Sequence, residues 1–235
     1  MLAVLLAVCL LSSVGMAAPA PTADVLWPRP QSLVCSDGGR ALADTFAITT
    51  TSGSPLLKAA IKRYEAIVKE AAAGKDGESA ASSTAAHAAL ETVKQSALSS
   101  VAVSVASDAE DLTPQTDYSY TLVYEEGAAE GSLKAPTVFG AVAGLETLSQ
   151  LVDPNATSTL LATACTISDF PAYVHRGLLV DSGRRFMPVA LLKDLLDSMA
   201  YSKFNVMHLH LSDWAAVRLE IAAFPELTSG LDGQL

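Results

Sequence analysis

The feature that most constrains the fold is a strand–helix–strand pattern in the last third of the chain. It comprises an apolar run at 176–180, an amphipathic segment at 191–200 and a β-rich run at 204–211. Two strands joined by a crossover helix form a βαβ unit, in which the strands are parallel. Asp181 and Asp213 follow the two strands, so we expect them at one edge of the sheet, where α/β proteins place their sites.

The crossover segment has a helical apolar stripe. We expect five side chains of this stripe to face inward: Leu191, Leu192, Leu195, Leu196 and Met199.

The preceding part of the chain, up to Asp169, alternates predicted strands with two predicted helices. One helix is expected from Pro55 to Ala73, with Ser54 as its N-cap, and a second from Gly140 to Val152. Strands are predicted at 101–105, 118–124, 133–139 and 160–167. Short connections and an excess of strands predict an α+β layer, one sheet covered on one face by two helices.

The first twenty residues are typical of a secretory signal. They carry no charge, and the apolar run Leu2–Leu11 is followed by small residues. This run is shorter than the ~20 residues of a membrane span, and no later segment reaches that length, so we expect no membrane span. In the secretory pathway Asn155, in an Asn-Ala-Thr sequon, would be a glycosylation acceptor. There Cys35 and Cys165 could form a disulfide or remain two buried thiols.

Composition excludes two broad classes. Half of the residues are hydrophobic, which is incompatible with general disorder. The formal net charge is −10, from 15 basic and 25 acidic residues, and no basic cluster suits a phosphate backbone. We therefore expect no nucleic-acid partner.

The residues that could carry chemistry are Asp181, Arg184, His208, His210 and Asp213. The two histidines share one face of their strand, which would suit zinc, while the planar fork of Arg184 would suit a polar substrate. The chain has only two further histidines, at 87 and 175, so three metal ligands are hard to assemble, and we expect neither metal nor cofactor.

Each of these residues also has a purely structural interpretation. The histidines could be hydrogen-bonded core side chains, and Asp181 could pair with Arg184 to fix the loop after the strand. Asp213 could cap the following turn.

Longer stretches resemble a known family. The segments HRGLLVDSGRRF at 175–186, LDSMAYSKFNV at 196–206 and HLHLSD at 208–213 resemble the β-N-acetylhexosaminidases of glycoside hydrolase family 20, in particular the lysosomal branch. The segments LWPRPQ at 26–31 and GLETLSQL at 144–151 are similar to the family's non-catalytic domain. Leu209 and Trp214 depart from the family pattern, which usually has an aromatic and an acidic residue there.

The resemblance implies a retaining, substrate-assisted reaction that removes terminal N-acetylhexosamines from glycans. In this chain Arg184 matches the arginine that binds outer hydroxyls of the sugar, and Asp213 matches an aspartate that orients a later histidine. A lysosomal, vacuolar or extracellular location is implied, and a dimer is compatible with the full-length enzyme.

The resemblance also divides the chain. It implies a signal peptide at 1–20, a non-catalytic α+β domain at 21–170, and at 171–235 the first βαβ unit of an incomplete (β/α)₈ TIM barrel. A whole barrel takes ~250 residues. No Asp-Glu dipeptide, the family's catalytic pair, follows Asp181. We therefore expect no catalysis by this chain alone; the alternative is a short, non-catalytic glycan-binding or interaction protein.

Overall fold

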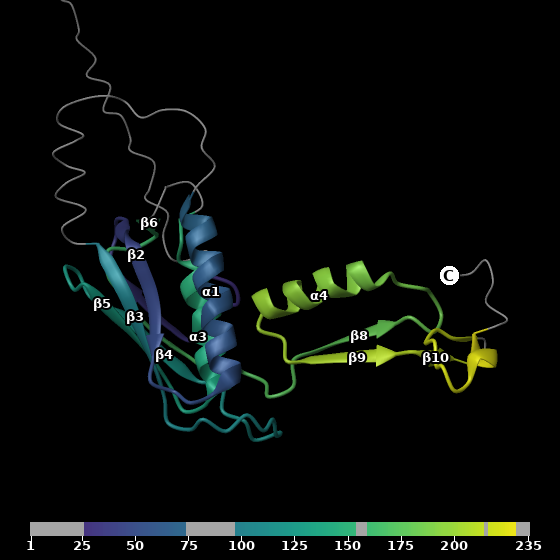
Figure 1. Ribbon diagram of the computed structural model, residues 1–235. Coiled ribbons are helices and arrows are strands. Elements are labelled where there is room, and N and C mark those ends of the chain that lie inside the picture. Colours follow the sequence, from purple (N-terminus) through teal and green to yellow (C-terminus); the bar gives the residue numbers. More distant parts are fainter. Residues whose placement is uncertain (1–25, 74–96, 154–158, 214–215, 229–235) are drawn as a thin grey trace, which may run out of the picture.

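The structure is a computed structural model that describes residues 26–73, 97–153, 159–213 and 216–228. A sheet with two helices forms one part, and a strand–helix–strand unit extends from its helical side (Figure 1). The predicted signal at 1–20, as well as His87, Trp214 and the sequon at Asn155, lie outside the described residues.

The first part is built on a mixed seven-stranded sheet. Its strand order is β1-β7-β4-β5-β3-β2-β6, in which β2–β3 and β3–β5 are parallel pairs and the other pairs are antiparallel. The strands are β1 (Ser32–Cys35), β2 (Arg40–Thr50), β3 (Leu98–Val105), β4 (Tyr120–Tyr124), β5 (Glu130–Ala135), β6 (Thr159–Leu160) and β7 (Cys165–Asp169).

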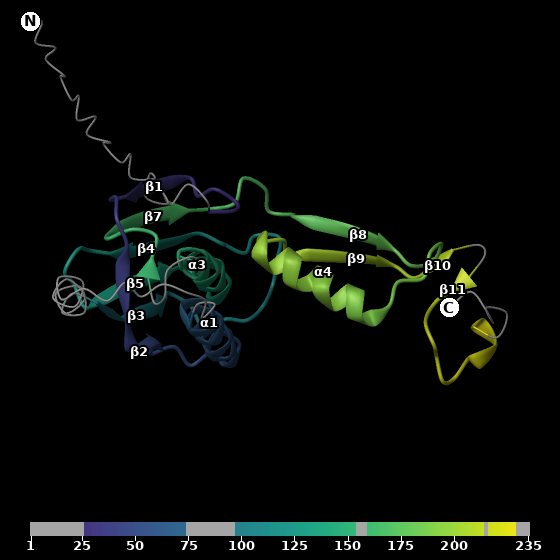
Figure 2. The same ribbon diagram turned by 90° about the horizontal axis from the view of Figure 1, so that it is seen from above.

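Two helices cover one face of this sheet, as expected, and the views of Figures 1 and 2 agree on this. Helix α1 spans Pro55–Ala73, and Ser54 caps it by accepting a hydrogen bond from the backbone N–H of Leu57 at 3.0 Å. Helix α3 spans Val138–Gln150. It begins two residues before the predicted Gly140 because the Thr137 hydroxyl accepts a hydrogen bond from the first turn.

Two strand predictions are corrected. The predicted strand 160–167 is two strands, β6 and β7, which pair with different neighbours. The predicted strand 133–139 ends at Ala135, because the apolar residues that follow belong to the start of α3. A continuous apolar run cannot by itself show where a strand gives way to a helix.

The core lies between the sheet and its two helices. Leu57 of α1, Leu145 and Leu148 of α3, and Leu122 and Leu133 of the sheet are all fully buried. The Cβ of any residue larger than glycine at 144 would meet Leu133 and Tyr120, so Gly144 lets α3 approach the sheet closely. Cys35 and Cys165 form a disulfide between β1 and β7, which settles the alternative left open by the sequence.

The second part is a parallel strand–helix–strand unit, as predicted. Strands β8 (Gly177–Asp181) and β9 (Val206–His210) are parallel, and α4 (Val189–Tyr201) connects them. Beyond β9 lie the short antiparallel pair β10 (Ser212–Asp213) and β11 (Ala216–Val217) and the 3₁₀ turn η2 (Pro225–Leu227).

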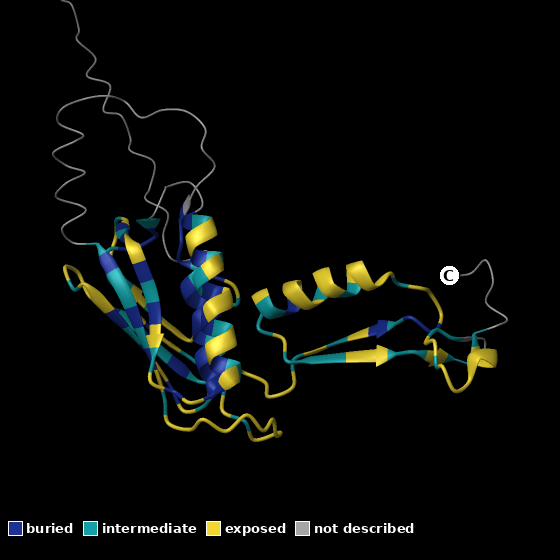
Figure 3. Cartoon of the chain, in the orientation of Figure 1, coloured by how far each residue is buried: buried dark blue, intermediate teal, exposed yellow. Residues whose placement is uncertain are grey.

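The predicted inward stripe of α4 is confirmed in part, since Leu192 and Leu195 are half-buried. Met199 is buried, but Leu191 and Leu196 are 47% and 48% exposed. Figure 3 shows the contrast, because α1 and α3 have a continuous buried face whereas α4 is largely exposed. The amphipathic spacing correctly predicts a helix, but it cannot predict how much of the helix the neighbouring strands cover. Among the described residues, no helix has the length and apolar character needed to cross a membrane.

Candidate functional site

The candidate site lies where β8 and β9 end. The two strands are in register, with Asp181 opposite His210, so their carboxyl ends meet at one edge (Figure 2). The loop after β8 turns back over this edge, because the backbone N–H groups of Ser182 and Gly183 both donate to the His210 carbonyl at 3.0 Å. A Cβ at Gly183 would lie 3.1–3.2 Å from the backbone of β10, so this residue allows the close approach of loop and strand.

The loop places Arg184 between two carboxylates. Arg184 Nε donates to Asp213 Oδ2 at 2.6 Å and lies 3.3 Å from Asp181 Oδ2. The Arg184 backbone N–H also donates to Asp181 Oδ1 at 3.0 Å. The two aspartates therefore converge on one guanidinium, as the parallel register predicts.

This cluster is anchored but open to solvent. The Asp213 side chain is only 13% exposed, whereas that of Arg184 is 74% exposed. The hydrogen bond and the charge of Asp213, with the charge of Asp181, raise the pKa of Arg184 above its usual value. The side-chain contacts of Arg184 use Nε, and its two terminal amino groups make no hydrogen bond within the described part of the chain. A planar pair of donors is thus available to a ligand.

Three potential metal ligands also lie at this edge. One ligand atom each of Asp181, His210 and Asp213 lies within 4.8 Å of the others, a spacing that could hold a metal ion. His208 does not belong to this group, so the geometry does not support the alternative of a zinc site on both histidines. The Arg184 guanidinium already lies against both carboxylates, and a metal cation would have to compete with it. His210 Nε2 lies 3.8 Å from Asp213 Oδ2, beyond hydrogen-bond distance.

A second polar cluster, which the sequence analysis missed, joins the two parts of the molecule. The ammonium group of Lys203, in the turn between α4 and β9, donates to Thr147 Oγ1 at 2.7 Å, Tyr120 OH at 2.9 Å and Asp169 Oδ2 at 3.0 Å. The Lys203 and Asp169 side chains are only 11% and 12% exposed. Burial lowers the pKa of Lys203, and the charge of Asp169 opposes this effect.

The backbone at Lys203 is unusual as well. Its φ of 56° is in the left-handed region, where glycine normally ends a helix. The N–H of Phe204 donates to the Met199 carbonyl at 2.8 Å, which completes a Schellman-type cap. A lysine at this position carries the strain of the left-handed conformation but supplies the ammonium group that contacts the sheet. The pattern of hydrophobic residues in the sequence does not predict this role of Lys203.

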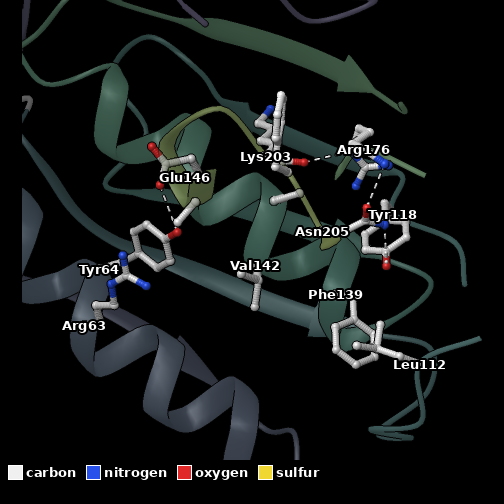
Figure 4. Close-up of a pocket in the computed structure, with 13 residues that line it drawn as sticks. Arg63, Tyr64, Leu112, Tyr118, Phe139, Val142, Glu146, Arg176, Lys203 and Asn205 are labelled. Atoms are coloured by element: carbon white, nitrogen blue, oxygen red, sulfur yellow. Dashed lines mark hydrogen bonds between the residues drawn. The ribbon is translucent and has the colours of Figure 1, made fainter. Parts of the chain in front are cut away.

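A cavity of about 250 Å³ lies beside this junction (Figure 4). Tyr118 and Arg176 form one wall, with the guanidinium carbon 4.6 Å from the ring centre, and Asn205 donates to Tyr118 OH at 3.1 Å. On another side Tyr64 OH donates to Glu146 Oε2 at 2.9 Å. These polar groups bond to one another, and the cavity is lined by residues of both parts. It therefore belongs to the junction between the two parts.

The β8–α4–β9 unit has the arrangement of α/β proteins, which place their ligand sites at the carboxyl ends of parallel strands. The cluster around Arg184 lies at this position.

Comparisons with known proteins give the family. The family model "Glycosyl hydrolase family 20, catalytic domain" matches residues 173–231, and "beta-acetyl hexosaminidase like" matches residues 26–151. The chain therefore belongs to glycosyl hydrolase family 20, as the sequence motifs indicated.

Relatives and solved structures agree. The chain is 34% identical to human beta-hexosaminidase subunit beta, over 97% of this chain and 42% of that protein. It is 31% identical to Arabidopsis thaliana beta-hexosaminidase 1, over 93% of this chain and 41% of that protein. The structure of Flavobacterium johnsoniae chitobiase matches with a TM-score of 0.65 at 27% identity, over 86% of this chain and 29% of that one. The chain thus spans about two fifths of the length of these two curated relatives.

Proposed function

We propose that this protein is a β-N-acetylhexosaminidase, in which Arg184 binds hydroxyl groups of a terminal N-acetylhexosamine. In this proposal β8–α4–β9 is the first unit of a (β/α)₈ barrel, residues 171–235 belong to the catalytic domain, and residues 21–170 form a non-catalytic domain. The two family matches and the hexosaminidase relatives support the assignment.

The proposal depends above all on how the Arg184 side chain is held and which of its donors remain available. Its Nε is held by Asp213 and Asp181, while its terminal amino groups have no partner among the described residues. Two parallel donors on a fixed plane can bind neighbouring hydroxyls of one sugar ring. Because the side chain is 74% exposed, a sugar can reach these donors from solvent.

Asp213 acts beside Arg184 in this proposal. It is the less exposed of the two aspartates and has its Oδ2 near both Arg184 and His210. The family resemblance implies that this carboxylate orients a histidine later in the sequence, not His210, and thereby supports an acid that protonates the leaving oxygen. The substrate's own acetamido oxygen would serve as the nucleophile, as the family resemblance implies.

The proposal extends to the protein's route through the cell. We propose that residues 1–20 are a signal peptide, that Asn155 is glycosylated, and that the protein reaches a lysosomal, vacuolar or extracellular location. The Cys35–Cys165 disulfide supports an oxidising route, since such bonds persist in secretory compartments.

The experiment measures binding and turnover separately. N-acetylglucosamine binding to the purified protein is followed by NMR, and hydrolysis is followed with a chromogenic N-acetyl-β-glucosaminide. Arg184→Ala and Asp213→Ala are compared with Arg185→Ala, a matched control because Arg185 is an exposed arginine in the same loop.

We expect the wild type and Arg185→Ala to bind the sugar and Arg184→Ala to lose binding. Because no Asp-Glu pair follows Asp181, binding without turnover is the expected result for this chain. Absence of sugar binding by the wild type would contradict the proposed function. Turnover that survives both Arg184→Ala and Asp213→Ala would contradict the proposed site.

A further inference from the structure

Asp181 directs both of its carboxylate oxygens to Arg184. Oδ1 accepts the Arg184 backbone N–H at 3.0 Å, and Oδ2 lies 3.3 Å from Arg184 Nε. One side chain thus contacts the backbone and the side chain of the same residue. This arrangement restrains both the loop conformation and the first torsions of the arginine.

The second carboxylate on Arg184 is shared with another group. Asp213 Oδ2 receives the Nε hydrogen bond at 2.6 Å, but the same oxygen lies 3.8 Å from His210 Nε2. The hydrogen bond and the ion pair of the Asp181 side chain, in contrast, both go to Arg184. Asp181 therefore restrains Arg184 independently of how Asp213 is engaged.

This restraint matters because Arg184 is exposed. A long, solvated arginine side chain has many rotamers, and a ligand that immobilises it must offset the lost conformational entropy. An arginine that is already held loses less on binding, so its donors bind more tightly without any new contact.

We infer that Asp181 is a positioning residue that holds the Arg184 guanidinium in a sugar-binding orientation. That the ligand is a sugar rests on the proposed function. The restraint of Arg184 by Asp181 does not depend on it. Asp181 itself contacts no sugar in this arrangement and acts through Arg184.

The test compares Asp181→Asn and Asp181→Ala with Asp194→Asn. Asp194 is an exposed aspartate of α4, so its variant makes the same charge change in the same unit and away from the site. Asp181→Asn keeps an oxygen for the Arg184 backbone N–H and removes the charge, whereas Asp181→Ala removes both contacts. Thermal unfolding of each variant identifies any that does not fold, in which case Asp181→Asn carries the test.

Two measurements are made on each variant. The first is the ¹⁵N heteronuclear NOE of the Arg184 Nε–H group, with Arg185 as an internal reference in the same loop. The second is the dissociation constant for N-acetylglucosamine. We expect Arg184 to be more rigid than Arg185 in the wild type and in Asp194→Asn, and to become mobile in the Asp181 variants. We expect sugar affinity to fall about 3- to 10-fold, with Asp181→Ala affected more than Asp181→Asn.

The two proposals fail in different ways. If the wild type binds no sugar, the proposed function is contradicted, while the NOE still reports whether Asp181 restrains Arg184. If Arg184 stays as rigid in both Asp181 variants as in the wild type, the role of Asp181 is overturned, whatever the protein binds. An equal loss of affinity in Asp194→Asn would also overturn it, because the effect would then be one of net charge.

Discussion

The sheet with α1 and α3 and the β8–α4–β9 unit are built from similar elements, but they bury very different amounts of apolar surface. The first has a continuous core with leucines that are completely buried, such as Leu57, Leu133 and Leu145. Among the described hydrophobic residues after 170, Val180 and Met199 are buried and the others are half-buried or exposed. Burial of apolar surface is the main stabilising contribution to folding, so this contribution is much smaller in the second region than in the first.

The difference shows what holds the second region in place. Its contacts with the first region include several polar ones: Lys203 binds three side chains of the first part, and Arg176 stacks on Tyr118. Polar contacts are directional, so they fix an orientation even where little apolar surface is buried.

The largest effect is expected at alkaline pH, and it should come from the sheet region. Burial raises the pKa of Tyr64, Tyr120 and Tyr124 above the usual value for tyrosine. Their stabilising contribution is complete below the unfolded-state pKa of about 10 and is lost as pH rises above it, because the unfolded chain then releases protons that the folded chain keeps. Each such tyrosine lowers the free energy of unfolding by about 1.4 kcal/mol per pH unit.

Urea unfolding between about pH 9 and about pH 11 measures this slope, because the window straddles the usual tyrosine pKa. Tyr124→Phe should reduce the slope, whereas Tyr201→Phe, at an exposed position of α4, should leave it unchanged. Equal slopes in the wild type and Tyr124→Phe would contradict the prediction.

The next effect compares the same substitution in two helices. Leu145→Ala in α3 removes a side chain that is completely buried, and should lower the free energy of unfolding by about 2–5 kcal/mol. Leu191→Ala in α4 removes one that is 47% exposed, and should change it by about 0.5 kcal/mol or less. Urea unfolding of both variants is the measurement, and similar losses would show that α4 is covered in solution.

A smaller loss is expected from Lys203→Met. The substitution leaves the nearly buried Asp169 carboxylate without its cation, and should lower the free energy of unfolding by about 1–3 kcal/mol. In addition, the peptide bonds between 170 and 176 should become more sensitive to protease, since the three hydrogen bonds from Lys203 to the first region are lost. Lys193→Met, at an exposed position of α4, is the control.

A double variant separates the ion pair from other effects of Lys203→Met. Asp169→Asn combined with Lys203→Met should recover part of the lost stability, because no unpaired charge is left buried. Strictly additive losses would contradict the pairing.

The smallest effect is expected at the exposed contact between the regions. Arg63 of α1 and Asp197 of α4 form an ion pair at 3.4 Å, with side chains 50% and 78% exposed. Arg63→Gln should change the free energy of unfolding by less than about 0.5 kcal/mol, because solvent screens such pairs. A loss as large as that of Lys203→Met would show that exposed contacts also hold the regions together.

Much of the fold could be predicted from local patterns. The Ser54-Pro55 start of α1, the two helices on one face and the parallel β8–β9 pair follow from capping residues, helical spacing and the rule for βαβ units. The division of 160–167 into two strands could not be predicted, because it depends on which neighbours the strands find in the sheet. The exposure of Leu191 depends on tertiary packing in the same way.

For the site, the proximity of Arg184 and Asp213 followed from parallel strands that end at one edge. The Lys203 cluster could not be found in this way, since its members come from four segments that are distant in sequence. From the sequence alone, a lysine between a helix and a strand is predicted to be an exposed turn residue, because the sequence does not show which sheet packs against it. The role of Lys203 is therefore a property of the assembled fold.

The disulfide that joins β1 to β7 has a consequence for proteolysis. Cys35 and Cys165 are separated by 130 residues, so the bond encloses most of the sheet region in one covalent loop. A protease that cuts the backbone once anywhere inside this loop leaves two pieces that stay attached. Such a nicked molecule would migrate as a single species on a denaturing gel and separate into fragments only after a thiol reductant is added.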